Sequence, residues 1–333
     1  MFKKFSPYFI RFLSGWLFTS QLISCNEKNL NNHEISFYYW KTNYSLTSYE
    51  KDFLKAHNVY KIYLRCFDVV LEDNKPVPQG VLLWKEAPED KIDYIPTVFI
   101  QNNIFSGADT NSIKELAEKV LILSTQILSS QHLSLKEIQV DCDWTQRTRD
   151  SYFYFLTLLK KKKIIVSNTL RVYQYKYRKE SGITPTDYAT LMCYNMGNMK
   201  NEKAGNSILN SKDIRLYIAT QQSYSQPLQI ALPIFHWTLL YHDHVFKGIL
   251  REAPKVQNTS WQKMSAITYV CTQDYYDVFC TQQFYKDDII RIEEISKQEL
   301  DESLDIIQKN VKNLKQEVIY FDLDSLQIRN CLD

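Results

Sequence analysis

The sequence predicts an α/β protein, and within that class a (β/α)8 barrel of the TIM type. Apolar, β-branched and aromatic runs alternate with amphipathic runs, as expected for parallel strands joined by crossover helices. Eight strand-like runs can be counted, which is the number that closes such a barrel. The apolar content of 44% is enough for one large core, so a single domain is expected.

The elements follow one another regularly along most of the chain. Strands are expected at residues 35–40, 61–69, 94–101, 137–144, 164–173, 189–196, 228–237 and 318–322. Helices are expected from Ser45 or Thr47 to His57, and at residues 111–130, 147–162, 211–221 and 296–315. The pairs Thr47 with Glu50 and Ser296 with Glu299 have capping-box spacing, which marks two helix starts.

Two segments depart from the alternation. Residues 71–91 contain three prolines and a glycine without helical period, so a hairpin or loop is expected there in place of one helix. Residues 238–288 are aromatic and show no crossover pattern. We expect them to be an irregular elaboration over one rim of the barrel, between strands seven and eight.

The N-terminus resembles an export signal. Basic residues precede an apolar stretch at 12–23, which is too short for a comfortable membrane span. The stretch ends in Leu22-Ile23-Ser24-Cys25, which resembles the bacterial lipobox and implies lipid attachment at Cys25. A plain signal peptide is the alternative. The expected organisation is a signal peptide at 1–24, a tether at 25–34 and a barrel domain at 35–333, placed in the bacterial cell envelope on its periplasmic or cell-surface side.

Composition and motifs exclude several classes of partner. Net charge is only +2, and the one basic run, 160–163, ends an amphipathic segment, so no nucleic-acid partner is expected. The membrane is expected to be contacted through the lipid alone. The sequence contains no P-loop and no GxGxxG, so no cofactor is expected. It contains no CxxC, and the histidines have no carboxylate at metal-ligand spacing, so no metal is expected. Cys66, Cys142 and Cys193 are expected to be small buried hydrophobes, and Cys271 and Cys280 could pair.

Polar and aromatic side chains gather at the C-terminal ends of the expected strands, where barrels of this type carry their active sites. The fourth strand is the most informative, because a strand buried on both faces is normally apolar throughout. Asp141 and Asp143 interrupt it, and alternation directs both into the barrel, about 6.5–7 Å apart. They would repel unless protonated or neutralised, for which Arg65 and Arg171 are candidates. A ligand or catalytic site is one interpretation, and a buried ion-pair network is the other.

Two motifs resemble the chitinase family of glycoside hydrolases. Val140-Asp141-Cys142-Asp143-Trp144 is similar to that family's fourth-strand signature, and Met192-Cys193-Tyr194-Asn195 to its sixth-strand motif. In that family the tyrosine and its neighbours hold the N-acetyl group of the substrate. The chain as a whole, over residues 35–325, more closely resembles an uncharacterised family of bacterial envelope proteins with a chitinase-like barrel, which carries no established activity.

The chain departs from the chitinase pattern at two positions. Thr145 stands where the family has its proton donor, and Asn195 replaces an aspartate. Threonine has no accessible acidic proton, so an acid would have to come from Asp143, Asp68 or Asp322. A glycan-active hydrolase with Asp141 and Asp143 as catalytic residues is slightly preferred. A glycan-binding protein that has lost the acid is the close alternative, and a structural envelope protein without ligand is the third. The side chains expected to contact the glycan are Asp68, Trp144, Arg171, Tyr194, Asn195, Trp237 and Asp322, and Trp40 is a further aromatic strand end.

Overall fold

The computed structural model describes residues 33–218, 224–250, 252–257 and 259–332. The expected signal peptide, Cys25 and nearly all of the expected tether lie outside these residues. Residues 33–333 form one compact unit. No helix among the described residues is long and apolar enough to cross a membrane.

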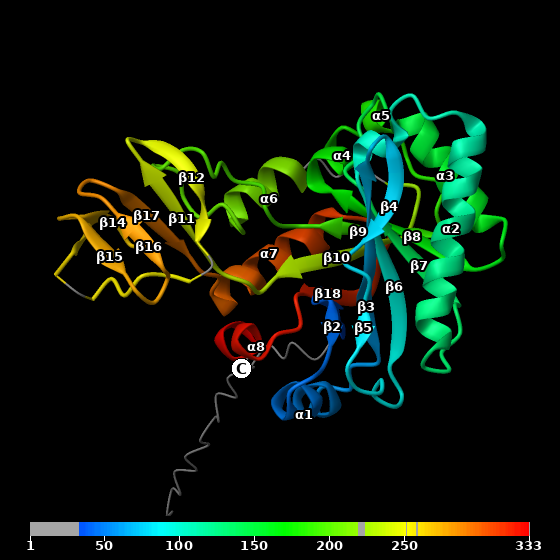
Figure 1. Cartoon of the computed structure of the whole chain (residues 1–333), viewed down its shortest axis with the longest axis horizontal. Helices are drawn as coiled ribbons and strands as arrows, with labels where there is room; N and C mark the ends of the chain where they lie inside the picture. The colour runs from blue at the N-terminus through cyan, green and yellow to red at the C-terminus, as the bar shows by residue number, and fades with distance from the viewer. Residues whose placement is uncertain (1–32, 219–223, 251, 258, 333) are drawn as a thin grey trace, which may run out of the picture. The chain divides into compact units, whose positions relative to one another are not determined.

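Eight parallel strands form a closed barrel, which confirms the predicted fold class (Figure 1). The order around the barrel is β1-β18-β10-β9-β8-β7-β6-β3, and pairing of β1 with β3 closes it. The strands are β1 (Glu34–Tyr39), β3 (Lys61–Glu72), β6 (Asp93–Ile100), β7 (Glu137–Asp141), β8 (Ile165–Arg171), β9 (Tyr188–Met192), β10 (Leu228–Pro233) and β18 (Leu314–Phe321).

The helices cover the barrel from outside and pack through apolar faces such as Ile113, Leu116 and Val120 of α2. They are α1 (Ser48–Ala56), α2 (Thr110–Ser129), α3 (Arg149–Lys160), α4 (Val172–Lys176), α5 (Arg178–Ser181), α6 (Ser211–Ile218), α7 (Lys297–Asn310) and α8 (Ser325–Cys331), with a 3-10 turn, η2 (Asn102–Phe105). Both expected capping boxes are present, at Thr47 and at Ser296.

Several predicted element ends are wrong. Helix α7 ends five residues early, because the chain turns at Asn313, which has a left-handed φ of 61°, and β18 starts at Leu314. The fifth strand ends at Arg171, since residues 172–176 are helical. Strands β7, β9 and β10 end three or four residues before the predicted ends. The residues beyond these ends therefore belong to loops and need not follow strand alternation.

The segment without helical period is a hairpin, as predicted. Strand β4 (Lys75–Gln79) pairs antiparallel with the C-terminal half of β3. After it, β5 (Leu83–Trp84) pairs with β2 (Asn43–Tyr44), which follows β1. The prolines at 76 and 78 lie on the edge strand β4, where a missing amide proton costs no internal pairing.

The segment between β10 and β18 is not irregular, which corrects the prediction. It forms an antiparallel sheet with the order β12-β11-β17-β14-β13 and a separate hairpin of β15 and β16. Its apolar centre includes Leu240, Trp261, Phe284 and Ile290. The strands are β11 (Trp237–His242), β12 (Val245–Leu250), β13 (Trp261–Lys263), β14 (Thr268–Cys271), β15 (Tyr275–Asp277), β16 (Gln282–Phe284) and β17 (Ile289–Glu293). We call this part the small sheet.

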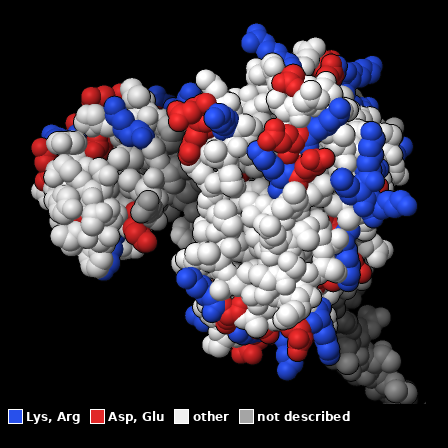
Figure 2. All heavy atoms as spheres, turned by 45° about the vertical axis from the view of Figure 1, so that its right-hand side comes forward, with Lys and Arg blue, Asp and Glu red and all other residues white. Residues whose placement is uncertain are grey.

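The three cysteines expected to be buried hydrophobes, Cys66, Cys142 and Cys193, are indeed buried. Cys271 and Cys280 are free thiols and do not pair in this structure. On the face shown in Figure 2, acidic and basic side chains are interspersed. That face therefore carries no single-sign charged surface.

Candidate functional site

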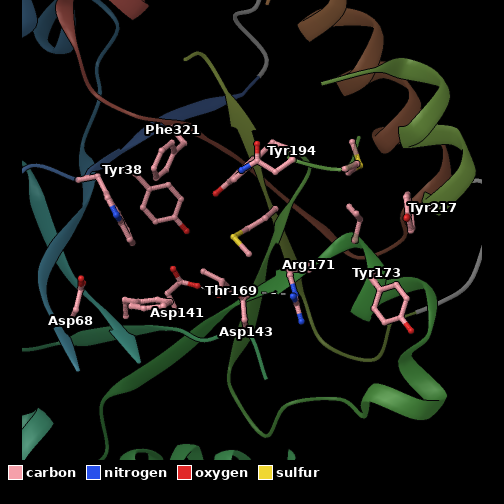
Figure 3. A pocket seen from close by; sticks show the side chains of 16 residues that line it. Tyr38, Asp68, Asp141, Asp143, Thr169, Arg171, Tyr173, Tyr194, Tyr217 and Phe321 are labelled. Carbon is pink, nitrogen blue, oxygen red and sulfur yellow. Dashed lines mark hydrogen bonds and ion pairs between the residues drawn. The ribbon is translucent and has the colours of Figure 1, made fainter. Parts of the chain in front are cut away.

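A cavity of about 620 Å³ opens at the C-terminal ends of the barrel strands (Figure 3). Its wall combines aromatic rings with charged side chains, and neighbouring strands of the barrel supply them in turn. The lining residues are Tyr38, Trp40, Asp68, Phe99, Asp141, Asp143, Thr169, Arg171, Val172, Tyr173, Met192, Tyr194, Asn195, Met196, Tyr217 and Phe321.

Asp141 is the last residue of β7 and lines the cavity. Its Oδ1 accepts a hydrogen bond from Thr169 Oγ1 at 2.6 Å. Burial raises the pKa of Asp141 to about 6, and the negative charges of Asp143 and Asp68 act in the same direction. Asp141 therefore exchanges its proton near neutral pH, as a general acid must.

Asp143 lies beyond the end of β7 and faces the same cavity. Its Oδ1 is 3.2 Å from Arg171 Nε, an ion pair in which both side chains keep contact with solvent. Arg65 makes two contacts with Asp68, through Nε at 2.9 Å and Nη2 at 2.6 Å. The two arginines expected to neutralise the aspartates of the fourth strand therefore have different partners. Arg171 pairs with Asp143 as predicted, and Arg65 pairs with Asp68 instead.

Tyr194 and Asn195 follow β9 and line the cavity. The ring of Tyr194 packs 5.8 Å from that of Phe321. Asn195 has a left-handed φ of 56°, a conformation that asparagine tolerates better than most residues. Its N–H donates to the carbonyl of Ile208 at 2.7 Å, which fixes the loop that carries it. Four of the predicted contact residues, Asp68, Arg171, Tyr194 and Asn195, are therefore brought together.

Three predicted contact residues lie elsewhere. Trp144 is only 1% exposed, stacks on Tyr152 and donates from Nε1 to the Ser181 carbonyl, because β7 has already ended at Asp141. Trp237 is the first residue of β11 and donates to Glu293 at 2.7 Å. Asp322 does not line the cavity either, although burial raises its pKa to about 6.

Two lining residues were missed although the sequence contained a signal for them. Tyr38 lies two positions before Trp40, and Thr169 lies two positions before Arg171. Because successive side chains of a strand alternate between its faces, each pair shares the inward face. Tyr217 comes from α6, and no pattern in the sequence points to it.

The arrangement suits hydrogen bonding and proton exchange better than metal binding. Among the described residues, no group of three His, Cys, Asp or Glu side chains is placed to hold a metal ion. Thr145, at the position of the chitinase proton donor, is not among the lining residues. Its hydroxyl lies 3.3 Å from that of Thr148.

No family model matches the sequence, and no curated protein is found to be related to it. Solved structures with a similar trace include a chitinase from Chromobacterium violaceum, with a TM-score of 0.48, 11% identity and coverage of 89% of this chain and 96% of that one. A group II chitinase catalytic domain from Ostrinia furnacalis gives a TM-score of 0.47 and 8% identity, with coverage of 90% of this chain and 92% of that one. A chitinase of glycoside hydrolase family 18 from Pseudoalteromonas aurantia gives a TM-score of 0.44 and 10% identity, with coverage of 88% of this chain and 94% of that one.

Proposed function

We propose that this protein binds a glycan in the cavity at the C-terminal end of the barrel. The observation that carries the proposal is the composition of the cavity wall, in which aromatic rings stand beside carboxylates paired with arginine. Aromatic faces suit the apolar faces of sugar rings, and placed polar groups suit their hydroxyls. The chitinase-like motifs at 140–144 and 192–195 favour an N-acetylated glycan as the first to examine.

Binding takes precedence over hydrolysis because two of the three carboxylates are engaged. Asp143 is paired with Arg171 and Asp68 with Arg65, and the oxygens of these two carboxylates can accept hydrogen bonds from sugar hydroxyls. Thr145 supplies no acid. This order reverses the slight preference that the sequence alone gave to an enzyme.

Calorimetric titration of the protein with tri-N-acetylchitotriose, cellotriose, maltotriose and a soluble peptidoglycan fragment tests the proposal. We expect heat of binding with at least one of them. The variant Tyr194→Ala, which removes an aromatic wall, should weaken that binding at least tenfold. Tyr276→Ala, which removes an exposed ring outside the cavity lining, should leave it unchanged. A blank panel, or equal effects of the two variants, contradicts the proposal.

Hydrolysis is the second candidate, and the raised pKa of Asp141 favours it. Asp141 would protonate the glycosidic oxygen, and Asp143 would supply the second carboxylate of the pair that glycosidases use. Release of reducing ends from the bound glycan should then fall as pH rises above about 6, as Asp141 loses its proton.

Asp322 offers a matched control for that candidate, because burial also raises its pKa to about 6 but it lies outside the cavity lining. Asp141→Asn should abolish turnover and Asp322→Asn should preserve it. If the wild-type protein binds a glycan and never cleaves it, hydrolysis is ruled out and the binding proposal stands.

Export and lipid attachment at Cys25 are part of the same proposal. Support comes from residues 1–25, where a basic start and an apolar stretch precede Ser24-Cys25. In bacterial cells, Cys25→Ser should abolish incorporation of labelled palmitate and move the protein out of the membrane fraction. Cys280→Ser, at a partly exposed thiol of the small sheet, should change neither. Palmitate retained by Cys25→Ser contradicts the assignment.

A further inference from the structure

The interior of the barrel beneath the cavity is polar. A chain of hydrogen bonds starts at Tyr38 Oη, which reaches Gln139 Oε1 at 2.7 Å. Gln139 Nε2 lies 3.0 Å from Thr190 Oγ1, which lies 3.2 Å from Gln229 Oε1. Gln229 Nε2 ends the chain on Glu317. These five side chains come from β1, β7, β9, β10 and β18, and all are buried.

The donor-to-acceptor direction of this hydrogen-bond chain is fixed at Glu317, the end farthest from the cavity. Glu317 forms an ion pair with Lys61 Nζ at 3.0 Å and accepts a hydrogen bond from Ser36 Oγ at 2.5 Å. A carboxylate only accepts hydrogen bonds, so Gln229 must present its amide N–H to it. The carbonyl oxygen of Gln229 then faces Thr190 and the hydroxyl of Tyr63, at 3.0 Å.

Donor and acceptor can be assigned in the same way at each further hydrogen bond up to the cavity. Thr190 has one hydroxyl proton, which it gives to Gln229, so it accepts from Gln139. Gln139 therefore turns its carbonyl oxygen to Tyr38, and Tyr38 must donate. Burial raises the pKa of Tyr38 far above its ordinary value, so the phenol keeps that single proton. Thr190 is a second hydrogen-bonding neighbour of Tyr38, but it gives its one proton to Gln229, so the lone pairs of Tyr38 Oη remain for the cavity.

We propose that Tyr38 Oη is a hydrogen-bond acceptor subsite of the cavity. Glu317, at the opposite end of the barrel, sets which group donates and which accepts at each link of the hydrogen-bond chain. The subsite takes a hydroxyl or an amide N–H of a bound glycan and disfavours a group that only accepts. Tyr38 is the residue that contacts the ligand, and Glu317, Gln229, Thr190 and Gln139 are positioning residues. The inference rests on the proposed glycan binding for its ligand class.

The first experiment needs no ligand. Neutron diffraction from a deuterium-exchanged crystal of the free wild-type protein locates the deuteron on Tyr38 Oη. We expect it on the line to Gln139 Oε1, with the amide nitrogen of Gln139 towards Thr190. A deuteron directed into the cavity, or a reversed Gln139 amide, overturns the inference whatever the protein binds.

The second experiment is a double-mutant cycle read by calorimetry with tri-N-acetylchitotriose. Glu317→Gln keeps the size of the side chain but lets its amide donate as well as accept. The hydrogen bonds from Tyr38 to position 317 then no longer have one fixed donor-to-acceptor direction. We expect affinity to fall about tenfold, the equivalent of one net hydrogen bond. In a Tyr38→Phe background, the same change should have no further effect. A further tenfold loss there overturns the inference.

Glu137→Gln is the matched control, because Glu137 is buried in the same interior and accepts from Tyr188, which reaches Gln229 only through Tyr63. It should leave affinity unchanged. Lys61→Met tests whether loss of the ion pair alone explains the result, and it should cost less affinity than Glu317→Gln.

If thermal melting shows that Glu317→Gln does not fold, the neutron structure decides. If the wild type does not bind tri-N-acetylchitotriose, the neutron structure again decides on Tyr38, and a panel that is blank throughout overturns the proposed function alone.

Discussion

At the scale of single residues, Asp141 makes the most direct prediction about stability. Its pKa is about 6 in the folded protein and about 3.8 ordinarily, so the folded state binds more protons between these values. The stabilisation from protonated Asp141 is complete below about pH 4 and is lost as pH rises through 6. Asp141→Asn stays neutral and keeps an oxygen for Thr169. We expect it to be more stable than wild type at pH 8, by up to about 3 kcal/mol at about 1.4 kcal/mol per pKa unit.

Urea unfolding at pH 4 and pH 8 measures this difference. At pH 4 the two proteins should be nearly equal, since both carry a neutral side chain at position 141. A difference of the same size at both pH values would mean that charge burial is not its cause.

The sequence indicated the polar residues of the site better than its aromatic ones. An aspartate inside a buried strand violates the apolar pattern, so Asp141 was conspicuous, and Asp143 two positions later followed from alternation. Trp144 and Trp237 fit either a sugar platform or the core, and the choice depends on where the strand ends. That end is set by packing against neighbouring strands, which a single sequence does not show.

At the scale of elements, the loop from β9 to α6 carries Asn195 and Met196 into the cavity, and Gly197 permits its fold. A Cβ at Gly197 would lie 2.6 Å from the Cα of Ser207, so the two arms of the loop would separate. We expect Gly197→Ala to weaken glycan binding at least tenfold and to lower the melting temperature. Gly205→Ala is the control in the same loop, because its Cβ would meet nothing closer than 3.7 Å. Calorimetry and thermal melting of both variants test this. Equal behaviour of the two contradicts it.

Local chemistry made some elements predictable and left others hidden. The capping boxes at Thr47 and Ser296 lie within four residues of sequence, and both are present. The small sheet pairs β11 with β17 across about 50 intervening residues, and its strands are three to six residues long. Short strands with distant partners give little periodicity, which is why the segment read as irregular.

At the scale of the whole molecule, a buried ion pair joins the small sheet to the loop that borders the cavity. Arg291 and Glu293 of β17 are both fully buried and paired. Glu293 also accepts from Ser207, through the backbone N–H at 2.9 Å and Oγ at 2.6 Å. Arg291 donates to the carbonyls of Asn201 and Ala204. The sheet thus supports the loop through charge-assisted bonds.

Removing one member of this pair should be far worse than removing both. Glu293→Ala leaves the guanidinium of Arg291 buried without its counter-charge, and we expect a loss of about 3–5 kcal/mol in chemical denaturation. Replacing the pair by Arg291→Met with Glu293→Leu removes the uncompensated charge, and much of the stability should return. The double variant still lacks the acceptor for Ser207, so its glycan affinity should stay reduced while its stability recovers. If the double variant is as unstable as the single one, the hydrogen bonds to the loop, and not the charge of Arg291, dominate the coupling between the small sheet and the cavity.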